Sequence, residues 1–162
     1  MLVGMELPAT VEWALHCTWL LACARGTALP ARRLAGYHGL PQDYLAKALK
    51  ALVRADVLVA TSGPRGGYRL ARPPESITVL EIVTALEGDA PLFRCQEIRQ
   101  NGPAPLPRAQ CRRPCGIASV MHRAEAAWRT ELAHTSVADL LAHAGTGSTD
   151  RARRWLAATL ER

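Results

Sequence analysis

The 162-residue sequence contains no apolar run that approaches the roughly 20 residues a helix needs to cross a bilayer. Residues 1–9 contain Glu6 and no Lys or Arg, which is not the pattern of a secretory signal. We find no internal repeat, no nucleophile–base pair and no phosphate-binding loop, so an enzyme is the least expected class. With 49% hydrophobic residues the chain can still bury a packed core. We therefore expect a soluble, cytoplasmic protein that makes no membrane contact.

Lysine is scarce: of the 20 basic residues only Lys47 and Lys50 are lysines, and the rest are arginines. The formal net charge is +6, but the bases are unevenly spread. Residues 25–72 hold nine of them against Asp43 and Asp56. Genome composition can explain a preference for Arg over Lys, but it does not explain clustering. A compact basic block is typical of a protein that binds a polyanion.

Residues 10–25 have the pattern of a helix, with Thr10 as its N-cap and Gly26 just past its end. This helix is apolar nearly all round, so we expect it to be buried on more than one side, in a core and also at a subunit interface.

The basic block itself has the order of a winged helix. Residues 31–37 predict a short helix, residues 38–40 a turn, and residues 41–55 a second helix that Pro41 can open. In the second helix one face is apolar (Leu45, Leu49, Leu52 and Val53), and the opposite face carries Asp43, Lys47, Lys50 and Arg54. Residues 57–60 and 68–70 then read as two strands of a hairpin around a Gly-rich turn. Two short helices alone could be an ordinary amphipathic pair, but the hairpin that follows favours a winged helix.

The remaining chain predicts a loop and three helices. Residues 89–115 contain four prolines and look like a long loop, and residues 116–134 carry an apolar stripe that suits a dimerisation helix, although it could also pack on its own domain. Thr135 or Ser136 should cap a short helix to His143, followed by a flexible break at residues 145–148 and a last helix anchored by Trp155 and Leu156. The predicted fold is mainly α with a small β-wing. Its parts are a winged helix-turn-helix domain (residues 5–88, wing about 57–71), a cysteine loop (89–115), a dimerisation helix (116–134) and C-terminal short helices (135–162).

Five cysteines are an odd set for disulfides in a chain without an export pattern. Cys17 and Cys23 lie on the apolar first helix and are expected to be buried structural thiols. Cys115 directly precedes a helix, whose dipole favours a thiolate, and Arg112 and Arg113, which lie between Cys111 and Cys115, favour a thiolate as well. Cys95 could join them if the loop folds back. Such thiols suit zinc or an iron–sulfur cluster, and unligated thiols remain an alternative.

Glu12 and His16 are four residues apart and share a face of the first helix. An ionised carboxylate on so apolar a helix should have a partner. That partner could be His16 or Arg25, or else Glu12 and His16 could both be metal ligands.

Three short segments carry a pattern that is specific enough to compare with known proteins. They are Tyr44-Leu45-x-Lys47, Arg65-Gly66-Gly67-Tyr68-x-Leu70-Ala71 and Ile77-Thr78-Val79-Leu80-Glu81-Ile82. With the rest of residues 34–88 they resemble the IscR/NsrR/RsrR (Rrf-two) family of winged-helix transcription regulators. A three-cysteine loop and a long helix follow in the order that this family uses, so the resemblance covers about residues 5–143.

The opening Val11-Glu12-Trp13-Ala14-Leu15-His16-Cys17 is similar to the RsrR-type redox regulators. Most cluster-binding members space three cysteines closely, whereas here fifteen residues separate Cys95 from Cys111. The RsrR-type resemblance implies a 2Fe–2S cluster at a dimer interface, with Glu12 and His16 from one chain and two cysteines from the other. Cys111 and Cys115 are favoured over Cys95 because they adjoin the dimerisation helix. Trp13 is then the candidate switch residue beside the cluster.

The resemblance implies a homodimeric transcription regulator, expected to be a repressor, whose binding to a palindromic operator in double-stranded DNA follows the redox state of an iron–sulfur cluster. The DNA-binding residues would be Arg32, Arg33, Gln42, Asp43, Tyr44, Lys47, Lys50, Arg65, Gly66, Gly67 and Arg69. One alternative keeps the fold but senses nitric oxide, cluster loss or direct thiol oxidation without metal. Another is a DNA-binding or interaction module with a structural zinc at the three cysteines.

Overall fold

The computed structural model describes residues 7–64 and 66–160. Arg65, one of the expected DNA contacts, lies outside the described residues. The chain forms two compact units, one of residues up to Gly88 together with Leu132 onward, the other of Asp89–Glu131. The helices are α1 (Ala9–Cys23), α2 (Ala31–His38), α3 (Gln42–Arg54), α4 (Val79–Glu87), α5 (Gly116–His134), α6 (Val137–His143) and α7 (Gly145–Leu160). The strands are β1 (Leu58–Thr61) and β2 (Gly67–Leu70), and short 3-10 turns are η1 (Pro74–Ser76), η2 (Ile98–Gln100) and η3 (Arg108–Cys111).

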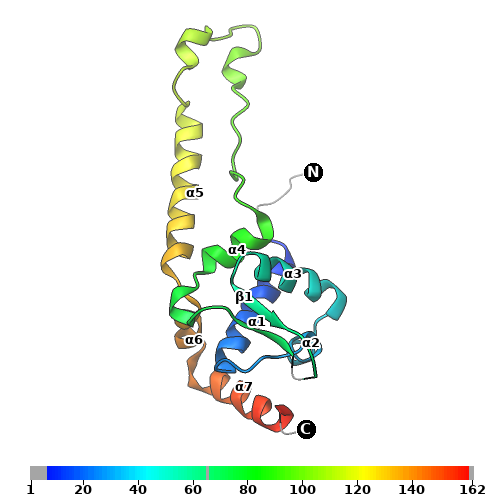
Figure 1. Ribbon diagram of the computed structural model, residues 1–162. Helices are drawn as coiled ribbons and strands as arrows, with labels where there is room; N and C mark the ends of the chain where they lie inside the picture. The colour runs from blue at the N-terminus through cyan, green and yellow to red at the C-terminus, as the bar shows by residue number, and fades with distance from the viewer. Residues whose placement is uncertain (1–6, 65, 161–162) are drawn as a thin grey trace. The chain divides into compact units, whose positions relative to one another are not determined.

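This architecture confirms the predicted fold class, which is mainly helical with one small antiparallel sheet (Figure 1). No helix in the described part of the chain combines the length and apolarity that a membrane crossing requires.

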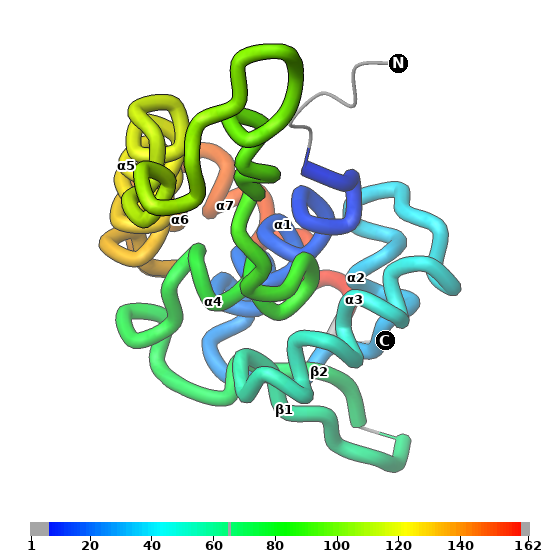
Figure 2. Tube along the Cα trace, turned by 90° about the horizontal axis from the view of Figure 1, so that it is seen from above, coloured from blue at the N-terminus to red at the C-terminus, as the bar shows by residue number. Residues whose placement is uncertain are grey.

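Helix α1 lies in the middle of the first unit, where it contacts α2, α3, α4, α6, α7 and β2 (Figure 2). Its buried residues face several sides, as its apolar sequence predicts. Cys17 and Cys23 are free, buried thiols, and burial raises the pKa of Cys17 to about 12. The expected N-cap is wrong: the helix begins at Ala9 after Pro8, so Thr10 lies within its first turn. Pro8 suits this boundary because a proline fixes φ and needs no hydrogen-bond acceptor.

The turn between α2 and α3 depends on Gly39, whose φ of 67° is left-handed. The Leu40 N–H donates to the Ala35 carbonyl at 2.9 Å, which closes the C-terminal turn of α2. Pro41 then precedes α3, whose apolar side buries Leu45, Leu49 and Leu52 completely. Burial of this face fixes the outward direction of the opposite one, so Asp43, Lys47, Lys50 and Arg54 are all exposed as expected.

The wing is a hairpin in which β1 pairs with β2 from Leu58↔Leu70 to Thr61↔Gly67. A further bridge joins β2 to the segment before α2, because Leu29 and Tyr68 exchange two backbone hydrogen bonds of 2.9 Å. This bridge fastens the base of the wing to the body of the first unit.

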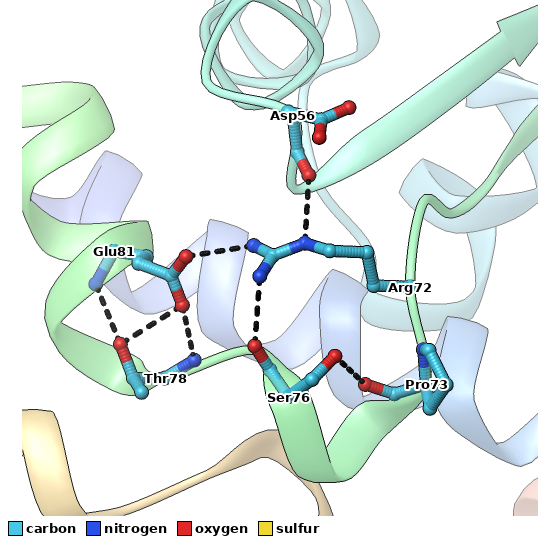
Figure 3. Close-up of polar contacts among 6 residues, drawn as sticks. All are labelled: Asp56, Arg72, Pro73, Ser76, Thr78 and Glu81. Carbon is cyan, nitrogen blue, oxygen red and sulfur yellow. Dashed lines mark hydrogen bonds and ion pairs between the residues drawn. The ribbon is translucent and has the colours of Figure 1, made fainter.

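Arg72 connects the end of the wing to α4 (Figure 3). Its guanidinium donates to Glu81 Oε1 at 2.7 Å, to the Ser76 carbonyl at 2.9 Å and to the Asp56 carbonyl at 3.4 Å. Glu81 also completes a capping box with Thr78 at the start of α4. Although Arg72 belongs to the basic block in the sequence, its half-buried guanidinium is paired with Glu81 and does not contribute a free charge to the DNA-binding surface.

The C-terminal helices differ from expectation at one point. Ser136 caps α6 through a capping box with Asp139, as predicted. The expected flexible break at residues 145–148 is wrong, because α7 already begins at Gly145. Gly145 has a φ of 74° and so ends α6 and starts α7 without a linker. Ala152 and Leu156 are buried in the core, and this burial outweighs the weak helix propensity of the Gly- and Ser-containing first turn.

In the second unit an irregular segment runs beside α5 (Figure 1). Glu125 of α5 accepts from the Leu92 N–H at 3.1 Å, and Arg129 bridges Asp89 at 2.5 Å and Glu125 at 3.1 Å. Apart from η2 and η3 the segment has no regular structure over its described residues, which agrees with its prolines. These polar contacts set the path of the loop that carries the three cysteines.

Candidate DNA-binding face and cysteine loop

The outward face of α3 combines positive charge with an exposed aromatic ring. Lys47 and Lys50 are exposed, and the Tyr44 side chain is 61% exposed. The Lys47 Nζ lies 5.8 Å from the centroid of the Tyr44 ring, within cation–π range. The fully buried leucines on the other side of α3 hold this face outward. The arrangement suits a helix that lies against a polyanion and offers both point charges and a planar ring.

The other expected DNA contacts surround this face on α2, at the start of α3 and on the wing. Arg32, Gln42 and Asp43 are exposed, whereas Arg33 and Arg69 are half-buried. The hairpin that carries Arg69 projects from the body of the first unit (Figure 2).

The packing of the hairpin itself requires glycine at two positions of the wing, and the sequence did not predict this requirement. A Cβ on Gly67 would lie 2.4 Å from the Leu29 carbonyl carbon, and one on Gly66 would lie 2.3 Å from the Thr61 oxygen. Both distances are far too short for a real contact, so the absent side chains are required by the hairpin turn and by the bridge to Leu29. The signal available in the sequence, two adjacent glycines before a strand, does not distinguish this need from close approach to DNA.

The cysteine loop places Cys115 directly before α5. Its sulfur accepts from the Ala118 N–H at 3.3 Å. This hydrogen bond is the main cause of a lowered pKa at Cys115, although partial burial acts against it. The Ile117 N–H, the Arg99 guanidinium and the Cys95 thiol lower the pKa further. The helix N-terminus therefore favours a thiolate as predicted, and Cys95 comes within hydrogen-bonding reach of Cys115.

The positive charge that helps to lower the pKa of Cys115 is that of Arg99, whereas the sequence indicated Arg112 and Arg113 for this role. Arg99 is oriented by an ion pair with Glu97 and by donation to the Arg113 carbonyl at 3.1 Å. It also acts electrostatically on Cys111. Nothing in the spacing of the sequence indicates this, because it depends on the path of the loop between the cysteines.

Glu12 and His16 occupy an open face of α1, contrary to the expectation of apolar surroundings. Both are exposed, and within residues 7–64 and 66–160 Glu12 makes no hydrogen bond or ion pair with His16, Arg25 or any other side chain. A crevice of about 180 Å³ is lined by Glu12, Trp13, His16, His38 and Leu40. The carboxylate and imidazole are therefore available to an external partner, and Trp13 lies half-buried between them and the core.

The two sets of donors belong to different units, with Glu12 and His16 in the first and the cysteines in the second. In the described part of the chain, no three His, Cys, Asp or Glu side chains are gathered so that they could hold a metal ion. The donor chemistry itself fits iron, because thiolates, imidazoles and carboxylates are all iron ligands in proteins.

Comparison with known proteins places the chain in a family. The model of the Rrf2 family, described as "Iron-dependent Transcriptional regulator", matches residues 7–143. A putative HTH-type transcriptional regulator of Aquifex aeolicus is 37% identical over 81 residues, which is 50% of this chain and 56% of that protein, so the chain matches little more than half of this relative. The HTH-type transcriptional regulator NsrR of Shouchella clausii is 27% identical over 138 residues, which is 85% of this chain and 89% of that protein. The solved structure of T. potens IscR has the same fold, with a TM-score of 0.66 at 22% identity over 89% of this chain and 91% of that one. The chain is a member of the Rrf2 family of transcriptional regulators.

Proposed function

We propose that the protein is a homodimeric DNA-binding regulator whose affinity for its operator depends on an iron–sulfur cluster of the 2Fe–2S type. The observation that carries the DNA-binding part is the exposed face of α3, where Lys47, Lys50 and Tyr44 are held outward by a fully buried leucine face. In this proposal α3 enters the major groove and the wing meets the adjacent backbone or minor groove. The contacts are Arg32, Arg33, Gln42, Asp43, Tyr44, Lys47, Lys50, Arg65, Gly66, Gly67 and Arg69.

The dimer is supported by the apolar surface of α5. Ile117, Val120 and Met121 are 71%, 53% and 39% exposed, and their spacing places them on one side of the helix. An exposed apolar stripe of this kind is costly in water and suits pairing with a second copy. A two-fold dimer of winged helices predicts a palindromic operator, with half-sites one helical turn or a multiple apart.

The cluster would be held by Glu12 and His16 of one chain and by two cysteines of the other. Cys115 is the first choice because its pKa is already lowered by the N-terminus of α5 and by Arg99. Cys111 and Cys95 compete for the second cysteine position: Cys111 interacts electrostatically with Arg99, and Cys95 acts on the sulfur of Cys115. Sharing between two chains agrees with the separation of the donor sets into different units of one chain.

When bound, such a cluster supplies a one-electron change in charge, at a potential set by its ligands. The residues of this chain that would respond lie on α1. Trp13 and His16 border the same crevice as His38, and His38 is the last residue of α2, the first helix of the helix-turn-helix. A repacking of Trp13 in this crevice is therefore a physical route from the ligands to the DNA-binding helices.

Iron and acid-labile sulfide in anaerobically purified protein test the cofactor. The proposal expects about two of each per site and visible absorption, whereas direct thiol oxidation predicts neither metal nor colour. Structural zinc predicts a colourless protein that loses structure when zinc is chelated. Nitric oxide sensing predicts a cluster whose loss, rather than its redox change, alters DNA binding.

Mixed dimers test the shared ligand set. One chain carries Glu12→Ala with His16→Ala, its partner carries Cys111→Ser with Cys115→Ser, and the two are purified through different tags. Sharing between chains leaves one intact site, so the mixed dimer should hold half of the wild-type iron while each variant homodimer holds none. A mixed dimer without iron would contradict the proposal.

A further inference from the structure

A second cavity lies in the first unit, among α1, α2, α6 and α7. Its volume is about 480 Å³, which is within the usual range for sites that bind small molecules. Its walls include Leu15, Trp19, Tyr37, His38, Leu140 and Ala144. His16 and His38, which border this cavity, also belong to the proposed cluster site and its link to α2, but the other walls have no part in them.

Two ring nitrogens at this cavity lack hydrogen-bond partners. Trp19 Nε1 and His38 Nε2 are the buried side-chain nitrogens or oxygens without a partner among the described residues, and both of their rings line the same cavity. Buried polar atoms are nearly always paired in folded proteins, so two orphans at one cavity call for an explanation. The rings that carry these buried nitrogens are themselves only half-buried and form part of the cavity lining.

The two nitrogens can both pair with one polar group of a ligand. An indole N–H only donates. A histidine Nε2 donates or accepts, according to the protonation of the ring. A hydroxyl group is the simplest group that can accept from the Trp19 N–H and at the same time pair with His38 Nε2, because a hydroxyl both donates and accepts.

The remaining walls indicate the body of the ligand. Leu15, Leu140 and Ala144 are apolar, and Tyr37 packs edge-on against His38 with ring centroids 4.8 Å apart. Flat aromatic groups suit such a lining because they stack or pack edge-on against rings. We propose that this cavity binds a small, neutral aromatic molecule that carries a hydroxyl group, with the ring among these apolar walls and the hydroxyl bridging Trp19 Nε1 and His38 Nε2.

The probe pair for this proposal is 2-naphthol and naphthalene, which differ only in the hydroxyl. In full-length dimer labelled with ¹⁵N-tryptophan, the four indole signals are assigned by single Trp→Phe variants. We expect 2-naphthol to shift the Trp19 indole signal saturably and to leave that of Trp128, in the other unit, unchanged. Naphthalene should bind about fivefold more weakly, the effect of one or two net hydrogen bonds. Equal affinity for the two compounds, or no saturable shift at Trp19, would overturn the proposal.

A cavity-filling variant provides a second measurement. Ala144→Phe places a ring in the cavity and should abolish the response of Trp19 to 2-naphthol. Ala142→Phe, at an exposed position of α6 two residues before Ala144, is the matched control and should retain it. Unchanged binding in a folded Ala144→Phe protein would contradict the assignment of the cavity. If that variant does not fold, the comparison of the two probes in the wild-type protein still decides.

Discussion

Replacing Gly67 by alanine tests whether the wing glycine serves packing or DNA contact. The added Cβ would lie 2.4 Å from the Leu29 carbonyl carbon, 2.5 Å from its oxygen and 2.6 Å from the Pro30 nitrogen. These atoms are backbone and cannot move independently, because Leu29 is fully buried and bonds Tyr68 through both its N–H and its carbonyl. Relief of the clash must therefore separate the wing from the segment before α2.

The expected cost combines overpacking of about 1–3 kcal/mol with a backbone angle unfavourable for alanine, which adds about 1 kcal/mol. Gly63→Ala is the matched control, because Gly63 also has a positive φ, of 101°, but its added Cβ meets nothing within 4 Å. We expect Gly67→Ala to lower the free energy of unfolding by about 2–4 kcal/mol and Gly63→Ala by about 1 kcal/mol.

Urea unfolding followed by circular dichroism measures both variants, and a gel shift with operator DNA follows. Equal stability of the two variants would refute the steric reasoning. If Gly67→Ala kept wild-type stability and lost only DNA affinity, the absent side chain would serve DNA approach instead.

Three further outcomes are expected. Lys47→Ala should weaken DNA binding and reduce the slope of log affinity against log salt by about 1, whereas Arg123→Ala on α5 should change neither, as measured by fluorescence anisotropy across salt concentrations. Ser136→Ala removes the capping box of α6 and should cost about 1 kcal/mol of unfolding free energy in urea, and an unchanged midpoint would show that the cap contributes nothing. Glu81 has a pKa below its ordinary value of 4.5, because hydrogen bonds from Thr78 and the Arg72 guanidinium outweigh the opposing effect of burial. Its contribution to stability is therefore present above that ordinary value and is lost as the pH falls through the lower folded-state pKa. Stability curves between pH 3 and 7 should show a smaller acid loss in Glu81→Gln than in wild type, and parallel curves would contradict this.

The winged helix could be predicted because its determinants are local. The face of Leu45, Leu49 and Leu52 and the Gly39 turn each act within a few residues, so sequence spacing indicated both the helix pair and its outward face. The start of α7 could not be predicted in this way. Its Gly- and Ser-containing first turn has weak helix propensity, and the compensating burial of Leu156 is a tertiary effect.

The candidate site was predicted only in part for the same reason. The position of Cys115 before a helix indicated a thiolate-favouring environment, which follows from local backbone geometry. The roles of Arg99 and Arg72 depend on how a loop and a hairpin fold back on more distant residues. The open setting of Glu12 was missed because an apolar helix does not reveal which of its faces its neighbours leave uncovered.

The central claim is that the redox state of a cluster changes DNA affinity, and an anaerobic gel shift tests it directly. The same preparation is measured oxidised and after reduction, and its absorption spectrum shows that the cluster remains present in both states. A coupling of about 1–3 kcal/mol corresponds to a 5- to 150-fold difference in affinity for the operator, which is the result we expect. A colourless, iron-free protein, or one that binds DNA equally in both states, would contradict the account while leaving the winged helix and its basic face in place.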